Sequence, residues 1–317
     1  MLTPGRAGRL AALCTVALAL AGCGAGNGSA GDGDAGDARI SVLTAVYPLR
    51  YVVEQVGGDQ VTVTSVAASG DPHTVELSPR QLRDFSAADV VVYVSGFQPA
   101  VDDAVAERRP AHVVDAADVA DLMPLAEGAG HDDEDGQTAE DADDGTELDP
   151  HFWLDPTRLA AVADQVAAVL SDASPERSAQ FSANADRLAA DLLDLAEELR
   201  AGLAECERDT IVTSHAAYGY LTELTGLEQV GVSGVDPEGE PSPARLREVR
   251  DLITELGVTT FFTEPLADPG VAESLAGDLG VHVAVFDPLE TLVDPATDYR
   301  DVMQSNLAAL RAGLGCR

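Results

Sequence analysis

The stretch Asp149-Pro150-His151-Phe152-Trp153-Leu154-Asp155 follows a long acidic run and begins a new apolar, foldable segment with a histidine. Asp71-Pro72-His73 has the same opening form, and Thr213-Ser214-His215 places a third histidine at a predicted strand end. Zinc takes about four nitrogen, oxygen or sulfur ligands in a tetrahedron. In α/β proteins such ligands come from loops at the carboxyl ends of strands. The three histidines therefore predict a metal site built from loops of an α/β fold, completed by a carboxylate.

Strand-like and helical runs alternate on both sides of this stretch. Short apolar runs separated by helical segments are typical of βαβ units and parallel sheets. The pattern predicts an α/β protein with two (β/α) lobes, each holding a mainly parallel four-stranded sheet. The predicted strands lie near residues 39–45, 61–66, 90–94 and 112–114, and near 210–213, 229–232, 259–262 and 281–286.

A long amphipathic helix is predicted between the two halves. From Phe181 to Leu203, apolar residues recur at steps of three or four, and Ser174-Pro175 provides a start signal. A helix over 174–205 would be roughly 45 Å long at 1.5 Å per residue. We interpret it as a rigid connector between an N-terminal lobe at 39–173 and a C-terminal lobe at 206–317. The alternative is a long helix inside one domain.

The N-terminus has the features of a secretory signal. Two arginines precede a short apolar run that ends in Leu20-Ala21-Gly22-Cys23. This ending resembles a bacterial lipobox, which predicts a signal peptide at 1–22 and a lipid anchor on Cys23. An ordinary cleavage site is the alternative. Residues 23–38 are rich in Gly, Ala, Ser, Asn and Asp, which predicts a flexible tether.

The charge of the chain limits the choice of partners. The formal net charge is −36, and a nucleic-acid binder would need a basic patch to neutralise phosphates, so nucleic acid is excluded. Ten acidic residues and His131 lie within 127–147. We interpret this segment as a solvated, disordered loop; a weak collecting site for cations is the alternative.

Two cysteines remain once the signal and the lipid site are set aside. Outside the cytoplasm a lone pair is usually bridged, so Cys206 and Cys316 are predicted to form a disulfide. Metal ligation by the two thiolates is the weaker alternative, because neither has neighbouring ligands in the sequence.

The order of these motifs, over about residues 39–317, resembles the metal-binding solute-binding lipoproteins of bacterial ABC importers for zinc or manganese. The matching motifs are Asp71-Pro72-His73-Thr74-Val75-Glu76, His151-Phe152-Trp153-Leu154-Asp155-Pro156, Ser214-His215 with Tyr218-Gly219-Tyr220, Glu240-Pro241-Ser242, Thr263-Glu264-Pro265 and Asp287-Pro288-Leu289. The resemblance implies two lobes joined by one rigid helix, with the metal between them. It implies the ligands His73, His151, His215 and Asp287, with Glu76, Trp153 and Glu264 nearby.

The resemblance also implies a metal and partners. Manganese-type members carry a carboxylate at the position of His215, so a histidine there favours zinc. Zinc members often have a histidine-rich loop before the second ligand, whereas this chain has an acidic one. The implied role is to capture one Zn²⁺ outside the cytoplasm, as a monomer anchored to the membrane by lipid. The implied partners are the permease and ATPase subunits of an ABC transporter, with a zinc metallochaperone as a further candidate.

Three other functions are weighed against zinc uptake. The first is a manganese-binding member of the same family. The second is a zinc hydrolase with Glu76 or Glu264 as general base, but the chain has no His-Glu-x-x-His, Gly-x-Ser-x-Gly or phosphate-loop motif. The third is a surface adhesin. We therefore expect no enzymatic activity, and we expect His112 to be structural or on the surface and His282 to be at least half-buried in a central strand.

Overall fold

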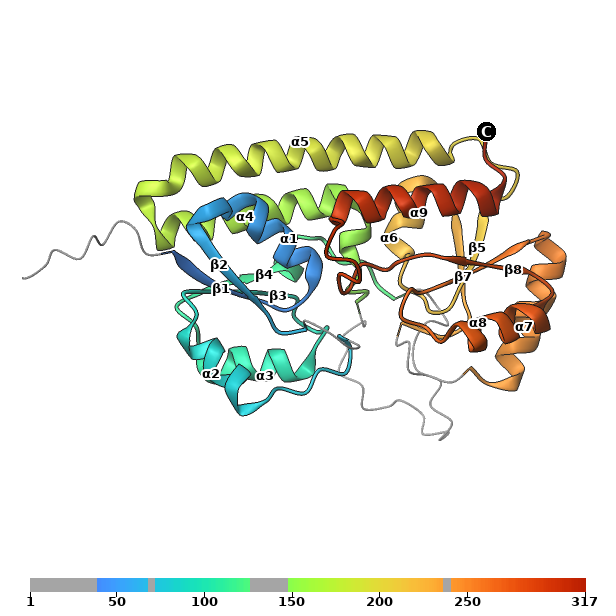
Figure 1. The fold of residues 1–317 in the computed structure, drawn as a ribbon, viewed down its shortest axis with the longest axis horizontal. Coiled ribbons are helices and arrows are strands. Elements are labelled where there is room, and N and C mark those ends of the chain that lie inside the picture. Colours follow the sequence, from blue (N-terminus) through green and yellow to red (C-terminus); the bar gives the residue numbers. More distant parts are fainter. Residues whose placement is uncertain (1–38, 68–71, 126–147, 236–240) are drawn as a thin grey trace, which may run out of the picture. The chain divides into compact units, whose positions relative to one another are not determined.

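The alternation of strands and helices produces two four-stranded sheets in which every strand pairing is parallel (Figure 1). The computed structural model describes residues 39–67, 72–125, 148–235 and 241–317, and residues 39–317 form one compact unit. The predicted fold class is confirmed. The predictions for the signal peptide 1–22, the lipid anchor Cys23, the tether 23–38 and the acidic segment 127–147 with His131 lie outside the described residues.

The first sheet has the strand order β2-β1-β3-β4. Its strands are β1 (Ile40–Thr44), β2 (Val61–Ser65), β3 (Val90–Tyr93) and β4 (His112–Asp115). The two central strands, β1 and β3, are almost entirely buried, whereas β2 at the edge alternates between buried and more exposed residues. Central strands of a parallel sheet are covered on both faces, which explains their continuous apolar runs.

The second sheet repeats this topology with the order β6-β5-β7-β8. Its strands are β5 (Thr210–Thr213), β6 (Glu228–Gly231), β7 (Thr260–Thr263) and β8 (His282–Val285). β5 and β7 are fully buried, and β8 lies at the edge. The prediction for His282 is therefore wrong: it is exposed, because the strand that carries it has only one neighbour.

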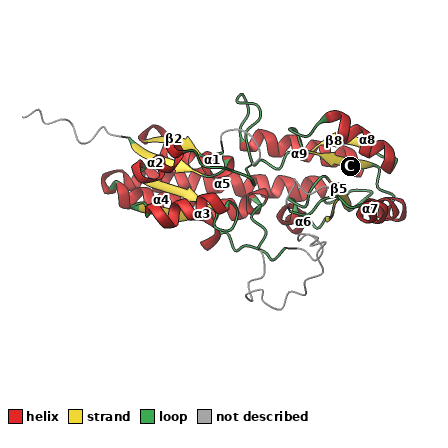
Figure 2. Ribbon diagram, turned by 90° about the horizontal axis from the view of Figure 1, so that it is seen from below, coloured by secondary structure: helices red, strands yellow, loops and turns green. Residues whose placement is uncertain are grey.

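Helices cover both sheets (Figures 1 and 2). They are α1 (Tyr47–Gly57), α2 (Pro79–Ala87), α3 (Pro99–Arg108) and α4 (Pro156–Ala173) before the long helix, and α6 (Gly219–Thr225), α7 (Pro243–Leu256), α8 (Pro269–Leu279) and α9 (Tyr299–Leu314) after it. Their starts follow the sequence signals. Ser78 caps α2 in a capping box and Asp155 caps α4 by accepting from the Thr157 N–H, each with a proline in the first turn.

The long helix α5 (Ser178–Leu203) runs past both sheets (Figure 1). Residues 175–177 of the predicted helix form a separate 3₁₀ turn, so α5 spans 26 residues, or roughly 39 Å. Phe181, Leu188, Leu192, Leu195 and Leu199 are buried along it. The same hydrophobic cluster includes residues of α1, α4, α6 and α9. Thus α5 is packed into a core shared by both halves, which suits a stiff connection.

The C-terminal end of the chain is fastened to the end of α5. The structure joins Cys206 to Cys316 across a sequence separation of 110 residues, and the Arg317 N–H donates to the Glu205 carbonyl. No helix in the part of the chain that the structure describes is both long and apolar enough to cross a membrane.

That the exported protein carries this disulfide stays a prediction. A bond that closes so long a loop removes entropy from the unfolded chain, so we expect Cys316→Ser to lower the free energy of unfolding by about 2–5 kcal/mol. Urea unfolding of the variant and the unaltered chain measures this. Mass spectrometry showing two free thiols in natively exported protein would contradict the pairing.

Candidate metal centre

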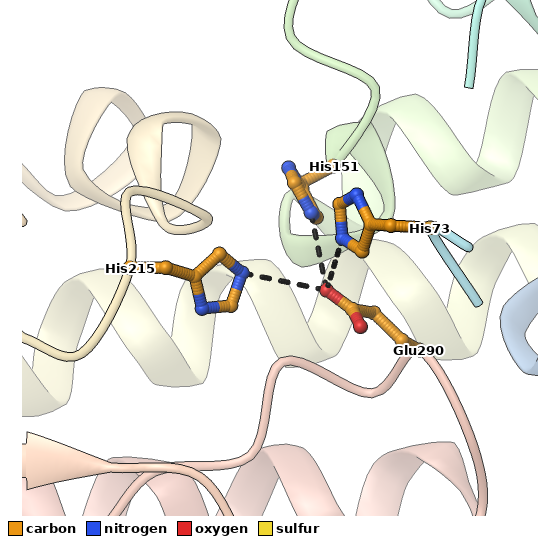
Figure 3. Close-up of side chains that lie close together, drawn as sticks. All are labelled: His73, His151, His215 and Glu290. Carbon is orange, nitrogen blue, oxygen red and sulfur yellow. Dashed lines mark hydrogen bonds and ion pairs between the residues drawn. The ribbon is translucent and has the colours of Figure 1, made fainter. Parts of the chain in front are cut away.

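The three histidines of the predicted site meet although they come from different parts of the chain (Figure 3). His73 lies in the segment between β2 and α2, His151 precedes the 3₁₀ turn Phe152–Leu154, and His215 lies just beyond β5. His151 and His215 are fully buried, and the His73 side chain is 10% exposed. Three separate segments thus bring ligand-type side chains to one point.

The three imidazoles converge on one carboxylate oxygen. The Nε2 atoms of His73 and His151 both lie 3.2 Å from Glu290 Oε1, and that of His215 lies 3.4 Å from it. A tetrahedron with zinc–ligand bonds of 2.0–2.1 Å has edges of about 3.3 Å. The three distances from Glu290 Oε1 therefore match tetrahedral edges, and the four ligand atoms lie within 4.8 Å of one another.

The predicted fourth residue, Asp287, is not in this cluster. Its Oδ1 accepts the Leu289 N–H at 2.8 Å, and its backbone is held by the Asn306 side chain through two hydrogen bonds of 2.9 and 2.8 Å. These contacts commit Asp287 to shaping the turn. The carboxylate that meets the histidines is Glu290, three residues later, so the structure places Glu290 beside them and not the predicted Asp287.

The local backbone explains this choice. Leu289 has φ +61°, a left-handed conformation that non-glycine residues rarely adopt, and its side chain is fully buried. The chain therefore changes direction between Asp287 and Glu290. The Glu290 carbonyl then accepts the Tyr47 N–H at 3.2 Å at the start of α1. A residue that follows β8 is thereby tied to the first lobe, with its side chain among the histidines.

Two further carboxylates orient the buried histidines. Asp149 Oδ1 lies 2.8 Å from His151 Nδ1, and Glu264 Oε1 lies 2.6 Å from His215 Nδ1. A carboxylate at Nδ1 fixes the tautomer that leaves Nε2 free to ligate a metal, and it raises the basicity of the ring. Both rings therefore present Nε2 to the point that they share.

His73 is supported by the segment between β3 and α3. The Phe97 ring meets the His73 ring edge-on, with centroids 4.7 Å apart. The buried Gln98 side chain donates from Nε2 to the Pro72 carbonyl at 2.7 Å, one residue before His73. These contacts place the histidine that is least buried of the three.

The structure sorts the other predicted residues. Trp153 is fully buried, its ring centroid lies 5.3 Å from that of His151, and its Nε1 donates to the Pro288 carbonyl. Glu264 lies against His215 as described. Glu76 is exposed and is not in the cluster. His112 is half-buried at the start of β4, also outside it.

Comparison with known proteins identifies the group to which the chain is related. Residues 42–313 match the ZnuA family, described as the zinc-uptake complex component A, periplasmic. The chain belongs to the ZnuA family. It is 31% identical over 289 residues to the zinc-binding protein AdcA of Streptococcus pyogenes serotype M6, which covers 87% of this chain and 56% of AdcA. It thus spans little more than half the length of that curated relative.

Two other relatives of this ZnuA-family chain are informative. The high-affinity zinc uptake system protein ZnuA of Bacillus subtilis is 28% identical over 306 residues, covering 94% of each chain. The crystal structure of Zn(II)-bound AdcA from Streptococcus pneumoniae superposes with a TM-score of 0.72 at 28% identity, covering 87% of this chain and 58% of AdcA. A relative of similar fold is thus known with zinc bound.

The electrostatics of the site in this ZnuA-family chain are dominated by the histidine–carboxylate pairs. Burial alone would lower the pKa of His215, but the carboxylates of Glu264 and Glu290 outweigh it and raise the pKa to about 10. Burial would also lower the pKa of His151, but the carboxylates of Asp149 and Glu290 outweigh burial and raise it. Burial acts to raise the pKa of Glu290, but the three histidines hold it well below the usual range. The site therefore favours an ionised Glu290 that faces positive charge.

Asp287 differs electrostatically from Glu290. Burial raises the pKa of Asp287 to about 6, helped by the negative charges of Glu290 and Glu264 and opposed by the bond from the Leu289 N–H. What separates the two carboxyls is geometry, because Glu290 lies in the cluster with the three histidines and Asp287 does not. The sequence signal that could have found Glu290 is weak, because it is only the presence of a second acid shortly after the Asp287-Pro288 turn.

Proposed function

We propose that this ZnuA-family chain captures one Zn²⁺ outside the cytoplasm and delivers it to the permease of an ABC transporter. The observation that carries the proposal is the convergence of three imidazole Nε2 atoms on Glu290 Oε1 at 3.2, 3.2 and 3.4 Å. Three nitrogens and one oxygen are a donor set that fits zinc, and the three nitrogen–oxygen distances match the edges of a zinc tetrahedron. The proposed ligands are His73, His151, His215 and Glu290.

Zinc is favoured over manganese by the kind of ligand. Imidazole suits zinc, whereas manganese prefers carboxylate, carbonyl and water oxygens, and only one carboxylate belongs to the cluster. Copper or nickel would also bind such a donor set in a test tube, because affinities follow the Irving-Williams order. The identity of the cargo is therefore tested best on protein purified without added metal.

Capture is favoured over zinc hydrolysis. A catalytic zinc has three protein ligands and an open position for water, whereas four side chains meet here. The candidate base Glu264 is also occupied, since its Oε1 lies 2.6 Å from His215 Nδ1 and accepts the Ser214 hydroxyl at 2.7 Å. The other candidate, Glu76, is exposed outside the cluster. We infer that the chain is not an enzyme.

The membrane anchor and partners are part of the same proposal. The Leu20-Ala21-Gly22-Cys23 sequence supports lipidation of Cys23, which would hold a monomer at the outer face of the cell membrane. The match to a zinc-uptake component supports permease and ATPase subunits as partners. A zinc metallochaperone is a candidate donor or acceptor of the ion.

Acid is expected to release the metal. An imidazole must be neutral to ligate, and the carboxylates of the metal-free site raise the pKa of His215 to about 10 and also raise that of His151. Protons therefore compete with zinc already below about pH 10, and zinc affinity should fall continuously as the pH is lowered from there. Zinc titrations between pH 9 and pH 5, with a chelator as competitor, measure the effect. Affinity that stays constant to pH 5 would contradict a three-histidine site.

Growth under zinc limitation tests the biological role. A strain lacking this protein should grow poorly when zinc is chelated, and the unaltered chain should restore growth. A chain with His215→Ala should not restore it, while one with His112→Ala should. Full rescue by His215→Ala at equal protein abundance would refute the proposed function.

A further inference from the structure

The phenol of Tyr220 joins the second lobe to a segment of the first that adjoins His151. Tyr220 lies in the first turn of α6 and is fully buried. Its hydroxyl donates to the Asp149 carbonyl at 2.6 Å and accepts the Met123 N–H at 2.8 Å. One hydroxyl thus holds two backbone groups that are distant in sequence.

The Asp149 carbonyl and the Met123 N–H belong to two chain segments that are also hydrogen-bonded to each other. The Asp149 N–H donates to the Met123 carbonyl at 2.8 Å, and Pro124 and Leu148 form an antiparallel bridge. Tyr220 therefore contacts a small braced unit. Because the hydroxyl supplies both a donor and an acceptor, phenylalanine at this position would leave the Asp149 carbonyl and the Met123 N–H without that partner.

The neighbouring glycine shows how closely α6 approaches. A Cβ added at Gly219 would lie 3.0 Å from Asp149 Oδ2 and 3.6 Å from the Met123 Cε. The backbone of α6 thus lies close to Oδ2 of the Asp149 carboxylate, whereas Oδ1 of the same carboxylate faces His151. Glycine permits this approach, and a larger residue would push on the carboxylate.

The ring of Tyr220 is fixed from the other side. The Arg158 guanidinium lies 4.8 Å from the ring centroid, and the same guanidinium donates to the carbonyls of Ala120 and Asp121 and pairs with Glu223 at 2.9 Å. A cation over an aromatic face is attractive. The phenol is therefore held in one orientation by both lobes.

Asp149 connects this contact to the metal site. Its Oδ1 accepts the backbone N–H of His151 at 2.9 Å and lies 2.8 Å from His151 Nδ1. The position of the Asp149 backbone therefore sets the position of the carboxylate that orients a proposed ligand.

We propose that Tyr220 is a positioning residue for metal retention: by fixing the Asp149 backbone from the second lobe, it holds the carboxylate that orients His151 in the first. This inference rests on the proposed zinc site. It makes the orientation of His151 depend on the contact between α6 and residue 149, so a displacement of α6 from that residue loosens a ligand that lies on the other lobe.

Zinc dissociation from Tyr220→Phe tests the inference. Disturbing a group that orients a ligand typically costs 10–100-fold in metal affinity, and we expect zinc release into excess chelator to accelerate by about tenfold or more. In zinc-loaded protein labelled with ¹⁵N-histidine, the His151 Nδ1 proton should also exchange faster with water. Thr225→Val is the matched control, because it removes another hydroxyl of α6, one that donates to the Leu221 carbonyl within the helix. The rate of zinc release and the exchange of the His151 Nδ1 proton should both stay unchanged in this variant.

A double-mutant cycle tests the route through Asp149. Once Asp149→Ala has removed the orienting carboxylate, the further change Tyr220→Phe should accelerate zinc release little. If the two residues acted independently, their effects on zinc release would be additive. Gly219→Ala serves as a second probe that keeps the phenol, and it should accelerate zinc release in the same direction. Unchanged release and proton exchange in Tyr220→Phe and Gly219→Ala, or additive effects in the cycle, would overturn the inference. Failure of the unaltered chain to bind zinc would instead overturn the proposed function.

Discussion

Replacing His151 with alanine is expected to weaken zinc binding by on the order of a hundredfold or more. Apparent binding free energies of four-ligand zinc sites are about 10–16 kcal/mol, so one ligand of four accounts for roughly 3 kcal/mol, and each 1.4 kcal/mol is tenfold in affinity. His151 is fully buried, its Nε2 atom lies 3.2 Å from Glu290 Oε1, and its Nδ1 atom lies 2.8 Å from Asp149 Oδ1. Its loss also leaves two buried carboxylates facing a cavity. Competition with a calibrated chelator at pH 7.5 measures the change.

The matched control is His112→Ala. His112 begins strand β4, pairs in register with Val90, and lies outside the cluster. Zinc stoichiometry and affinity should be the same as in the unaltered chain. Equal affinities in the two alanine variants would refute the assignment of His151 as a ligand.

The second large effect is expected at Glu290. Glu290→Gln keeps the size of the side chain but removes the negative charge on which three imidazoles converge, so we expect zinc affinity to fall by on the order of a hundredfold. Asp287→Asn is the matched control. An asparagine oxygen can still accept the Leu289 N–H, so the turn is retained and the affinity should change little.

These two variants separate the structure-based assignment from the one that the sequence suggested. If Asp287 were the ligand, the order of zinc affinities would be reversed, and Asp287→Asn would bind zinc far more weakly than Glu290→Gln. Thermal unfolding of both metal-free variants should accompany the titrations, because a collapsed turn would lower affinity for a different reason.

Much of the fold follows from local signals in the sequence. Apolar strands separated by amphipathic helices predicted two parallel sheets, because each such strand must be covered on both faces. Serine or aspartate before proline marked the starts of α2, α4 and α7. The apolar stripe from Phe181 to Leu203 predicted α5. What this pattern does not contain is strand order, so His282 was placed in a central strand although β8 lies at the edge.

The sequence predicted the three histidines of the candidate site from motifs, but not its carboxylate. His73, His151 and His215 follow turns or strand ends, which a sequence displays directly. The fourth carboxylate depends on the direction of the chain after β8, set by the left-handed backbone of Leu289 and by the bonds from Asn306 to Asp287. These contacts join residues 19 positions apart, and no local periodicity encodes them. Asp149 was visible beside His151, but its role depends on the placement of the imidazole.

The shared core bears on how the site would work. The cluster that contains the buried side chains of α5 also contains Trp153 of the first lobe and Tyr220 and Phe286 of the second. One hydroxyl adds a direct link between the two halves, since Tyr299 donates to the Trp153 carbonyl. The proposed ligands are thus mounted on a well-packed frame.

The measurement that tests the central claim most directly is anomalous diffraction at the zinc absorption edge, from crystals of protein purified without added metal. We predict one peak per chain, about 2.0–2.2 Å from the Nε2 atoms of His73, His151 and His215 and from a carboxylate oxygen of Glu290. A peak ligated by Asp287 in place of Glu290, or one located away from the three histidines, would contradict the account.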